Sequence, residues 1–357
     1  PPRSTLFPYT TLFRSTAAAP HDAVDLCPLS DGGPGFAALV GHRAETVGRG
    51  RGPQHEGSVD RLAPGVVLVG TTAYVDTSAA LGRGRGSSGV GEQLRAALGA
   101  DASRVVLGLV GPDRRIVPDA GLGLLVALGA AGLAGRLLLD PPHPAGDVDR
   151  PGQAAEITTH DLAGLSDALR LLAGVDLVGA CADDLPLLGL HGASAAAGGA
   201  GALSSADAQQ LERAVGQLAH AVISAETTSR RPDLLAGGEP AVPGRLRDVT
   251  GLPGAGAGGG IGWLVALAGG RLLPGAAVLA DAVDLRARAA AADLVVTTID
   301  HLDASTFHGS GAEQAVAAAA ETGVPAVVVA RTSMMSRRES SSAGISAVYV
   351  ASDRPRA

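Results

Sequence analysis

Three glycine-rich stretches carry residues that could do chemistry, because each stands just before a run with helical character. They are SDGGPG at 30–35, PDAGLG at 118–123 and LPGAGAGGG at 252–260. Glycine lets a backbone approach a ligand closely, and the unpaired amides of a helix N-terminus suit anions. An aspartate beside such a turn can hold Mg²⁺, accept a hydrogen bond from a hydroxyl or act as a base.

Two well-known nucleotide motifs explain these stretches poorly. None of them matches the phosphate loop GxxxxGK[ST], and GAGAGG at 254–259 fits only the letters of the dinucleotide fingerprint GxGxxG. No acidic residue ends a strand about 20 residues later, as that fingerprint requires. A nicotinamide-dependent dehydrogenase is therefore a weak alternative, and tight helix packing also explains these glycines.

A fourth segment, LVVTTIDHLDASTFHG at 294–309, ends a predicted strand in a cluster of polar residues. Sites of α/β proteins form at the carboxyl ends of strands. Asp300 or Asp303 with His301 could make an acid/base pair or part of a metal site. On spacing alone, a solvated loop explains the segment better than such a site.

Apolar runs alternate with Ala/Leu-rich helical patterns along the 357 residues, which is enough chain for two α/β domains. The alternation predicts an α/β protein with parallel sheets and right-handed crossovers. The expected strands are 24–29, 66–69, 105–110, 137–139, 175–181, 294–297 and 324–330. The expected helices are 35–40, 89–98, 122–133, 166–172, 205–221, 261–267, 277–288 and 312–322.

Composition narrows the class of protein. The chain has no Lys, so all 28 basic residues are Arg; they are scattered, and the net charge is −7. This argues against a nucleic-acid surface. Cys27 and Cys181 lie far apart in apolar runs, which predicts buried reduced thiols. The nearest candidate for a membrane span, 121–139, contains five glycines and an arginine, so we expect a cytoplasmic protein with no membrane partner. The oligomeric state stays open.

The first fifteen residues differ from the rest. FPYTTLFRS at 7–15 is what a common sequencing adapter gives when translated in one frame. We expect residues 1–15 to be an artefact and exclude them from reasoning about the fold.

Taken in order, seven segments resemble the bacterial glycerate kinase family. They are PLSDGGPGFAAL (28–39), SSGVGEQLRAAL (87–98), PDAGLGLLVALG (118–129), DLPLLGLHGASA (184–195), LPGAGAGGGIG (252–262), ADLVVTTIDHLDASTFHG (292–309) and GVPAVVVA (323–330).

The resemblance implies a fold and a reaction. It implies transfer of the ATP γ-phosphoryl group to a hydroxyl of D-glycerate, with Mg²⁺, giving phosphoglycerate. It also implies two α/β domains with the site in a cleft between them. The flavodoxin/Rossmann-like domain would comprise residues 16–64 plus 285–357, and the inserted α/β domain residues 65–284.

The resemblance also implies site residues. Asp31 and Asp303 would be catalytic, and Asp31 would also be the Mg²⁺ ligand. The substrate and phosphate groups would contact Gly32, Gly33, Gly35, Asp119, Gly121, Gly123, Gly254, Gly256, Gly258, Gly259, Thr297 and Thr306.

The chain departs from the family pattern mainly at charged positions. Ile299 stands where the family has Glu, His301 where it has Arg, and AAGGAGA at 196–202 lacks a Gln and a Lys. Phosphoryl transfer depends on such charges. The alternative is therefore a weak or inactive paralogue that binds a small acid or a nucleotide.

Overall fold

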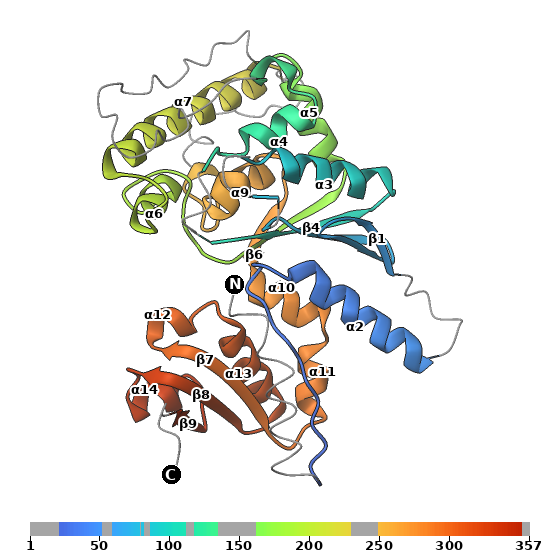
Figure 1. Cartoon of the computed structure of the whole chain (residues 1–357), viewed down its shortest axis with the longest axis vertical. Coiled ribbons are helices and arrows are strands. Elements are labelled where there is room, and N and C mark those ends of the chain that lie inside the picture. The colour runs from blue at the N-terminus through green and yellow to red at the C-terminus, as the bar shows by residue number, and fades with distance from the viewer. Residues whose placement is uncertain are drawn as a thin grey trace, which may run out of the picture.

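The computed structural model describes residues 21–51, 59–78, 80–81, 86–111, 118–134, 162–229 and 249–351. Within them the chain is a mixed α/β protein with two sheets, one of six strands and one of three (Figure 1).

The six-stranded sheet has the order β1-β2-β3-β4-β5-β6. The strands are β1 (Val59–Ala63), β2 (Val66–Val69), β3 (Thr72–Asp76), β4 (Arg104–Leu109), β5 (Asp176–Cys181) and β6 (Arg271–Pro274). From β3 to β6 every pair is parallel, whereas β1, β2 and β3 pair antiparallel. The prediction of purely parallel sheets is wrong here, because two-residue connections at 64–65 and 70–71 allow only hairpins.

Helices cover both faces of this sheet. On β4, Val105 and Leu107 pack into the larger core, and Val106 between them points to the opposite face, toward Phe36. This alternation explains why the strand reads as a continuous apolar run. The larger core is formed with α3 (Ser88–Gly99), α4 (Leu122–Ala127), the short 3₁₀ helix Ala131–Leu133, α5 (Leu165–Ala173), α7 (Ser205–Ser229) and α9 (Ala257–Leu267). The short helix α6 (Ala193–Gly199) lies against α7. The other face packs against α2 (Phe36–Arg51) and α10 (Gly275–Ala282).

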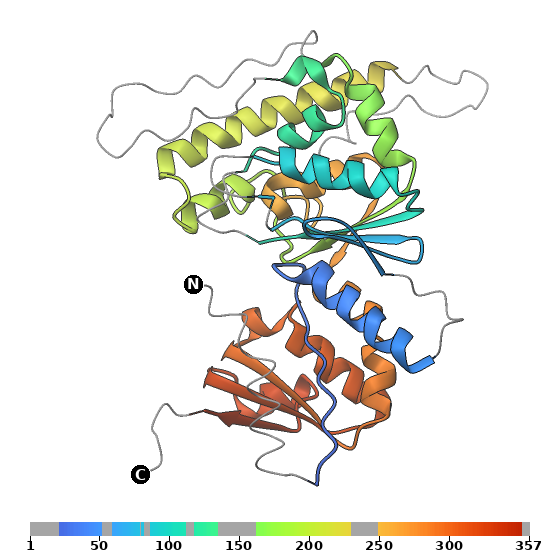
Figure 2. The same ribbon diagram turned by 45° about the vertical axis from the view of Figure 1, so that its right-hand side comes forward.

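The three-stranded sheet is parallel, in the order β7-β8-β9. Its strands are β7 (Val295–Leu302), β8 (Ala326–Ser333) and β9 (Ala347–Val350); its helices are α11 (Leu285–Ala290), α12 (Ala304–Phe307), α13 (Gly311–Thr322) and α14 (Arg337–Ser342). Val316 and Ala319 of α13 pack on Val328 of β8. In both views α10 lies between the two sheets (Figures 1 and 2).

Most predicted elements are present, with shifted ends. The expected helix 122–133 stops at Ala127 and continues as the short 3₁₀ helix. The expected helix 277–288 is two helices, because Asp284 between them has a left-handed backbone, φ 55°. The sequence did not indicate β1, β3, β6 or β9. The expected strand 137–139 and residues 1–15 lie outside the described residues.

The predicted strand 24–29 is wrong, because the segment pairs with no strand in the described chain. Side chains hold it instead: Arg288 of α11 donates to Asp25 and to the Leu26 carbonyl. Figure 1 shows the segment running beside α11. Cys181 is buried as expected, Cys27 is half-buried, and both thiols are free. No helix within the described ranges is long and apolar enough to cross a membrane.

Candidate functional site

The first glycine stretch, the Asp31 turn (residues 30–35), crosses the carboxyl edge of the six-stranded sheet, where β3 to β6 end. Gly32 has φ +107°, and a Cβ built on it would lie 2.4 Å from the Ala180 carbonyl oxygen of β5. The Asp31 carboxylate is exposed, and its Oδ1 accepts the Gly33 amide at 3.0 Å. The turn therefore needs glycine for close packing, and it places Asp31 at the rim of the sheet.

Asp76, at the end of β3, fixes the other end of this turn. Its Oδ2 accepts the Gly35 amide at 2.6 Å, and its Oδ1 accepts the backbone and hydroxyl of Ser78. A carboxylate at the start of α2 also suits the positive end of that helix. Asp76 was not among the predicted site residues, and its role follows only from the pairing of β3 within the sheet.

The second stretch, the Asp119 turn (residues 118–123), joins two helix starts. Oδ2 of Asp119 accepts the Ser87 amide at 2.7 Å, the Ser87 hydroxyl at 2.9 Å and the Gly123 amide at 3.2 Å. Oδ1 accepts the Gly121 amide at 3.0 Å. Asp119 thus ties the N-terminus of α3 to that of α4, and its oxygens are already used by protein donors.

The third stretch, the glycine loop (residues 252–260), packs tightly against its neighbours. Gly254, Gly258, Gly259 and Gly260 all have positive φ. A Cβ on Gly256 would lie 2.4 Å from the Pro186 carbonyl oxygen. The amides of Gly256 and Gly258 donate to the carbonyls of Leu185 and Val110, both at 2.8 Å. These two amides hold the loop on β4 and on the segment after β5, so they do not point to a phosphate.

The two latter stretches meet. The Ala120 amide donates to the Gly259 carbonyl at 3.1 Å, and the Trp263 indole donates to the Ala120 carbonyl at 2.8 Å. Gly254 also lies against Cys181, close to where Gly32 contacts Ala180. The three stretches predicted from the sequence therefore gather around the carboxyl edge of one sheet.

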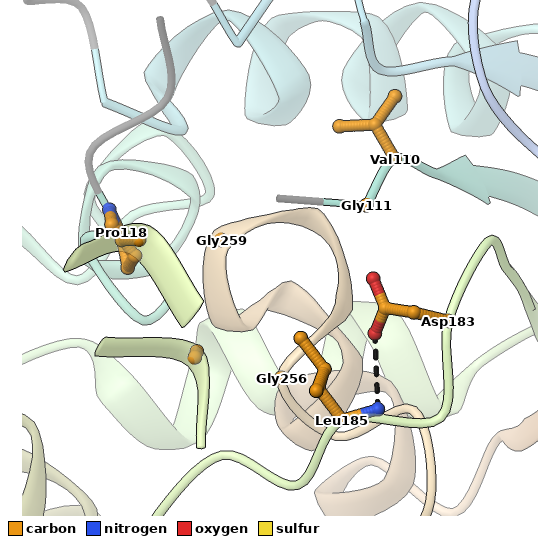
Figure 3. A pocket seen from close by; sticks show the side chains of 9 residues that line it. Val110, Gly111, Pro118, Asp183, Leu185, Gly256 and Gly259 are labelled. Carbon is orange, nitrogen blue, oxygen red and sulfur yellow. Dashed lines mark hydrogen bonds between the residues drawn. The ribbon is translucent and has the colours of Figure 1, made fainter. Parts of the chain in front are cut away.

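A pocket lies beside the Asp119 turn and the glycine loop, and the charged side chain among its described lining residues is Asp183. Figure 3 shows Asp183 facing the end of β4 and the glycine loop. The pocket is lined by Val110, Gly111, Pro118, Asp183, Leu185, Ala193, Ala197, Gly256 and Gly259. Gly256 and Gly259 were predicted site residues, but Asp183 was not. Its neighbours DLPLLGLHGASA supported the resemblance, yet nothing in the sequence marks this carboxyl as buried.

The two oxygens of Asp183 have different surroundings. Oδ1 accepts the Leu185 amide at 3.0 Å, whereas Oδ2 is buried and has no hydrogen-bond partner within the described structure. Burial raises the pKa of Asp183 to about 6; the Leu185 amide opposes the shift, and the negative charges of Asp184 and Asp31 add to it. Asp183 as a whole is half-buried, but its Oδ2 is a buried acceptor that needs a hydrogen-bond donor from water or from a ligand.

The remaining predicted residues belong to the other sheet. Asp303 caps α12: its Oδ1 accepts the Ser305 and Thr306 amides, both at 2.9 Å, and the Ser305 hydroxyl. The hydrogen bond from the Ser305 side chain, helped by the Thr306 amide, lowers the Asp303 pKa. The Thr306 hydroxyl donates to the His301 carbonyl, and Thr297 is paired with Val328 inside the sheet. Within the described residues, Asp303, Thr306 and Thr297 make no hydrogen bond or ion pair with the three stretches at the six-stranded sheet.

A sequence comparison that covers nearly all of the chain shows its family. A sequence model of the glycerate kinase family matches residues 11–357. The chain belongs to the glycerate kinase family. Its relatives include the uncharacterized protein Mb2228c of Mycobacterium bovis, 30% identical over 93% of this chain and 76% of that protein. The glycerate kinase of Bacillus subtilis is 32% identical over 68% of this chain and 55% of its own length.

The fold of the chain is also similar to that of a solved structure. The crystal structure described as "putative glycerate kinase 2 from Salmonella typhimurium LT2" superposes with a TM-score of 0.60 and 24% identity. It covers 94% of this chain and 83% of the other. At that identity the match shows the fold, with its two sheets.

Proposed function

We propose that this chain is a glycerate kinase, which transfers the γ-phosphoryl group of ATP to a hydroxyl of D-glycerate. Membership of the family supports a kinase and the use of ATP. The single observation that carries the proposal is the meeting of the Asp31 turn, the Asp119 turn and the glycine loop beside the Asp183 pocket. Ligands of open α/β sheets bind at this edge.

Mg²⁺ fits the donor set at this edge. The described residues contain no cluster of three or more His, Cys, Asp or Glu that could form a complete cage. Mg²⁺ at kinase sites uses one or two carboxylates and takes its other ligands from phosphates and water. The exposed Asp31 carboxylate would hold the ion, which when bound offsets the charge of the phosphate oxygens.

The finer division of the fold belongs to the same proposal. Residues 16–64 plus 285–357 would form the flavodoxin-like domain and residues 65–284 the inserted domain, with the substrate between them. Asp303 and Thr306, at the carboxyl end of β7, would then approach the ligand from the flavodoxin-like domain. In the structure both side chains form the capping box of α12.

One observation favours the alternative of a weak or inactive paralogue. Among the described lining residues of the pocket, the charged group is a carboxylate, and no arginine side chain contributes. Phosphoryl transfer depends on cations that neutralise the moving charge, and losing one such group costs about 10³- to 10⁵-fold in rate. Such a protein would still bind D-glycerate or MgATP.

A coupled assay of ADP release with MgATP and D-glycerate tests the proposal. The proposed kinase gives turnover that needs both ligands, and Asp31→Asn lowers it. Asp167→Asn, which changes an exposed carboxylate of α5, is the control and keeps the activity. Thermal shifts with either ligand but no ADP release would support the alternative, and no shift and no turnover would reject both.

A further inference from the structure

We propose that Asp183 accepts the proton of the substrate hydroxyl that attacks the phosphorus atom. This inference rests on the proposed function, and it names a catalytic residue that the sequence did not indicate. Its basis is the position of the Oδ2 atom in the pocket shown in Figure 3.

The geometry fixes which oxygen is available. Oδ1 is held by the Leu185 amide at 3.0 Å, so the plane of the carboxyl group is set by the backbone. Oδ2 is buried and unpaired among the described residues, and a Cβ built on Gly111 would lie 3.2 Å from it. A side chain at position 111 would therefore crowd the one oxygen that has an unused acceptor site, and glycine avoids this.

The other residues that line the pocket favour a hydroxyl group as the part of the ligand that contacts Asp183. Besides Asp183, the described lining consists of glycines and apolar residues, so the carboxyl is the acceptor toward which a donor must turn. The charges acting on it are the carboxylates of Asp184 and Asp31, and the Cys181 thiol is buried nearby. A phosphate is repelled by this arrangement, whereas an alcohol hydroxyl donates to it.

The chemistry balances with the reactants of the proposed function alone. The hydroxyl O–H bond breaks, its proton goes to Oδ2 of Asp183, and the oxygen forms the new bond to the γ-phosphorus of ATP. The bond between that phosphorus and the bridging oxygen breaks, and ADP leaves with the electron pair. A carboxyl whose pKa lies at about 6 is mostly ionised at neutral pH and still basic enough to take the proton.

Steady-state kinetics of Asp183→Asn in the full chain test this role. The amide keeps the shape of the side chain, but it cannot accept the proton. We expect kcat to fall about 10²- to 10⁴-fold, the usual size of general base catalysis, with the KM for ATP unchanged. The wild-type kcat should decline below pH 6, and this decline should vanish in the variant.

Asp184→Asn is the matched control, because it removes the neighbouring exposed carboxylate and leaves Asp183 in place. It should keep kcat and move the acidic decline slightly lower. Circular dichroism confirms that each variant is folded. Wild-type turnover with full activity in Asp183→Asn would overturn this inference alone. A wild type that releases no ADP would overturn the proposed function, and the proton transfer with it.

Discussion

Asp183 contributes to the pH dependence of the free energy of unfolding, because its pKa differs between the folded and the unfolded chain. In the folded chain the pKa of Asp183 is about 6, whereas an aspartate in an unfolded chain has a pKa of about 4. Between these values the folded state binds more protons, so stability falls as the pH rises through this window. We expect Asp183→Asn to be more stable than the wild type at pH 8, by about 2 kcal/mol.

Urea unfolding at pH 4 and at pH 8 measures this difference. The gain of the variant should be present at pH 8 and nearly absent at pH 4, where wild-type Asp183 is already protonated. A gain of equal size at both values would show that the carboxyl does not titrate as the structure implies.

Asp119 is the residue whose loss should cost most at the neighbouring turn. Asp119→Ala leaves the amides of Ser87, Gly121 and Gly123 without their acceptor. We expect a loss of about 2–4 kcal/mol in the free energy of unfolding, since buried donors lose their partners at two helix starts. Asp167→Ala breaks an ion pair whose two side chains are both 72% exposed and should cost under about 0.5 kcal/mol. Equal losses in the two variants would contradict the structural role of Asp119.

At the scale of elements, the glycine loop is shaped by packing. Gly256→Ala would drive a methyl group into the Pro186 carbonyl, 2.4 Å away, and the backbone would have to move. We expect this variant to lose more than about 2 kcal/mol. Gly216→Ala, in the middle of α7, meets no atom within 4 Å and should gain about 0.5–1 kcal/mol. Chemical denaturation of both variants checks the opposite signs, and a neutral Gly256→Ala would mean that the loop yields easily.

The sequence predicted those helices and strands whose pattern of apolar residues directly reflects how they are buried. The run VVLGLV at 105–110 is apolar because β4 is buried on both faces, and this can be recognised without knowing its neighbours. The run at 24–29 has the same apolar character, but it lies along α11 and pairs with no strand in the described residues. An apolar run alone does not reveal whether it will pair with a strand or pack against a helix. The sequence shows that each glycine stretch stands before a helix, but their position at one edge of the sheet, and Asp183 beside them, became visible only in the folded chain.

At the scale of the whole molecule, Arg288 links segments that are far apart in sequence. Its side chain is only 13% exposed, and it bonds to Asp25 and to the Leu26 carbonyl. The hydrogen bond from Arg288 lowers the pKa of Asp25. We expect Arg288→Ala to cost about 1–2 kcal/mol and to speed amide hydrogen exchange in residues 21–30.

Arg286→Ala is the control for this link. Arg286 pairs with Glu321 on the surface, where both side chains are more than half exposed, so its loss should leave exchange in residues 21–30 unchanged. Unaltered exchange in Arg288→Ala would mean that packing against the helices, and not the guanidinium, holds the segment.

The rate at which the Cys181 thiol can be alkylated reports how often the glycine loop opens at the carboxyl edge of the sheet. Its sulfur is buried against Gly254, and burial raises its pKa to about 12, so an alkylating reagent can attack only when the glycine loop lifts. The labelling rate of Cys181 therefore counts opening events, and the half-buried Cys27 serves as the internal reference. A ligand seated in the Asp183 pocket should slow the first rate and leave the second unchanged, which mass spectrometry can follow one thiol at a time.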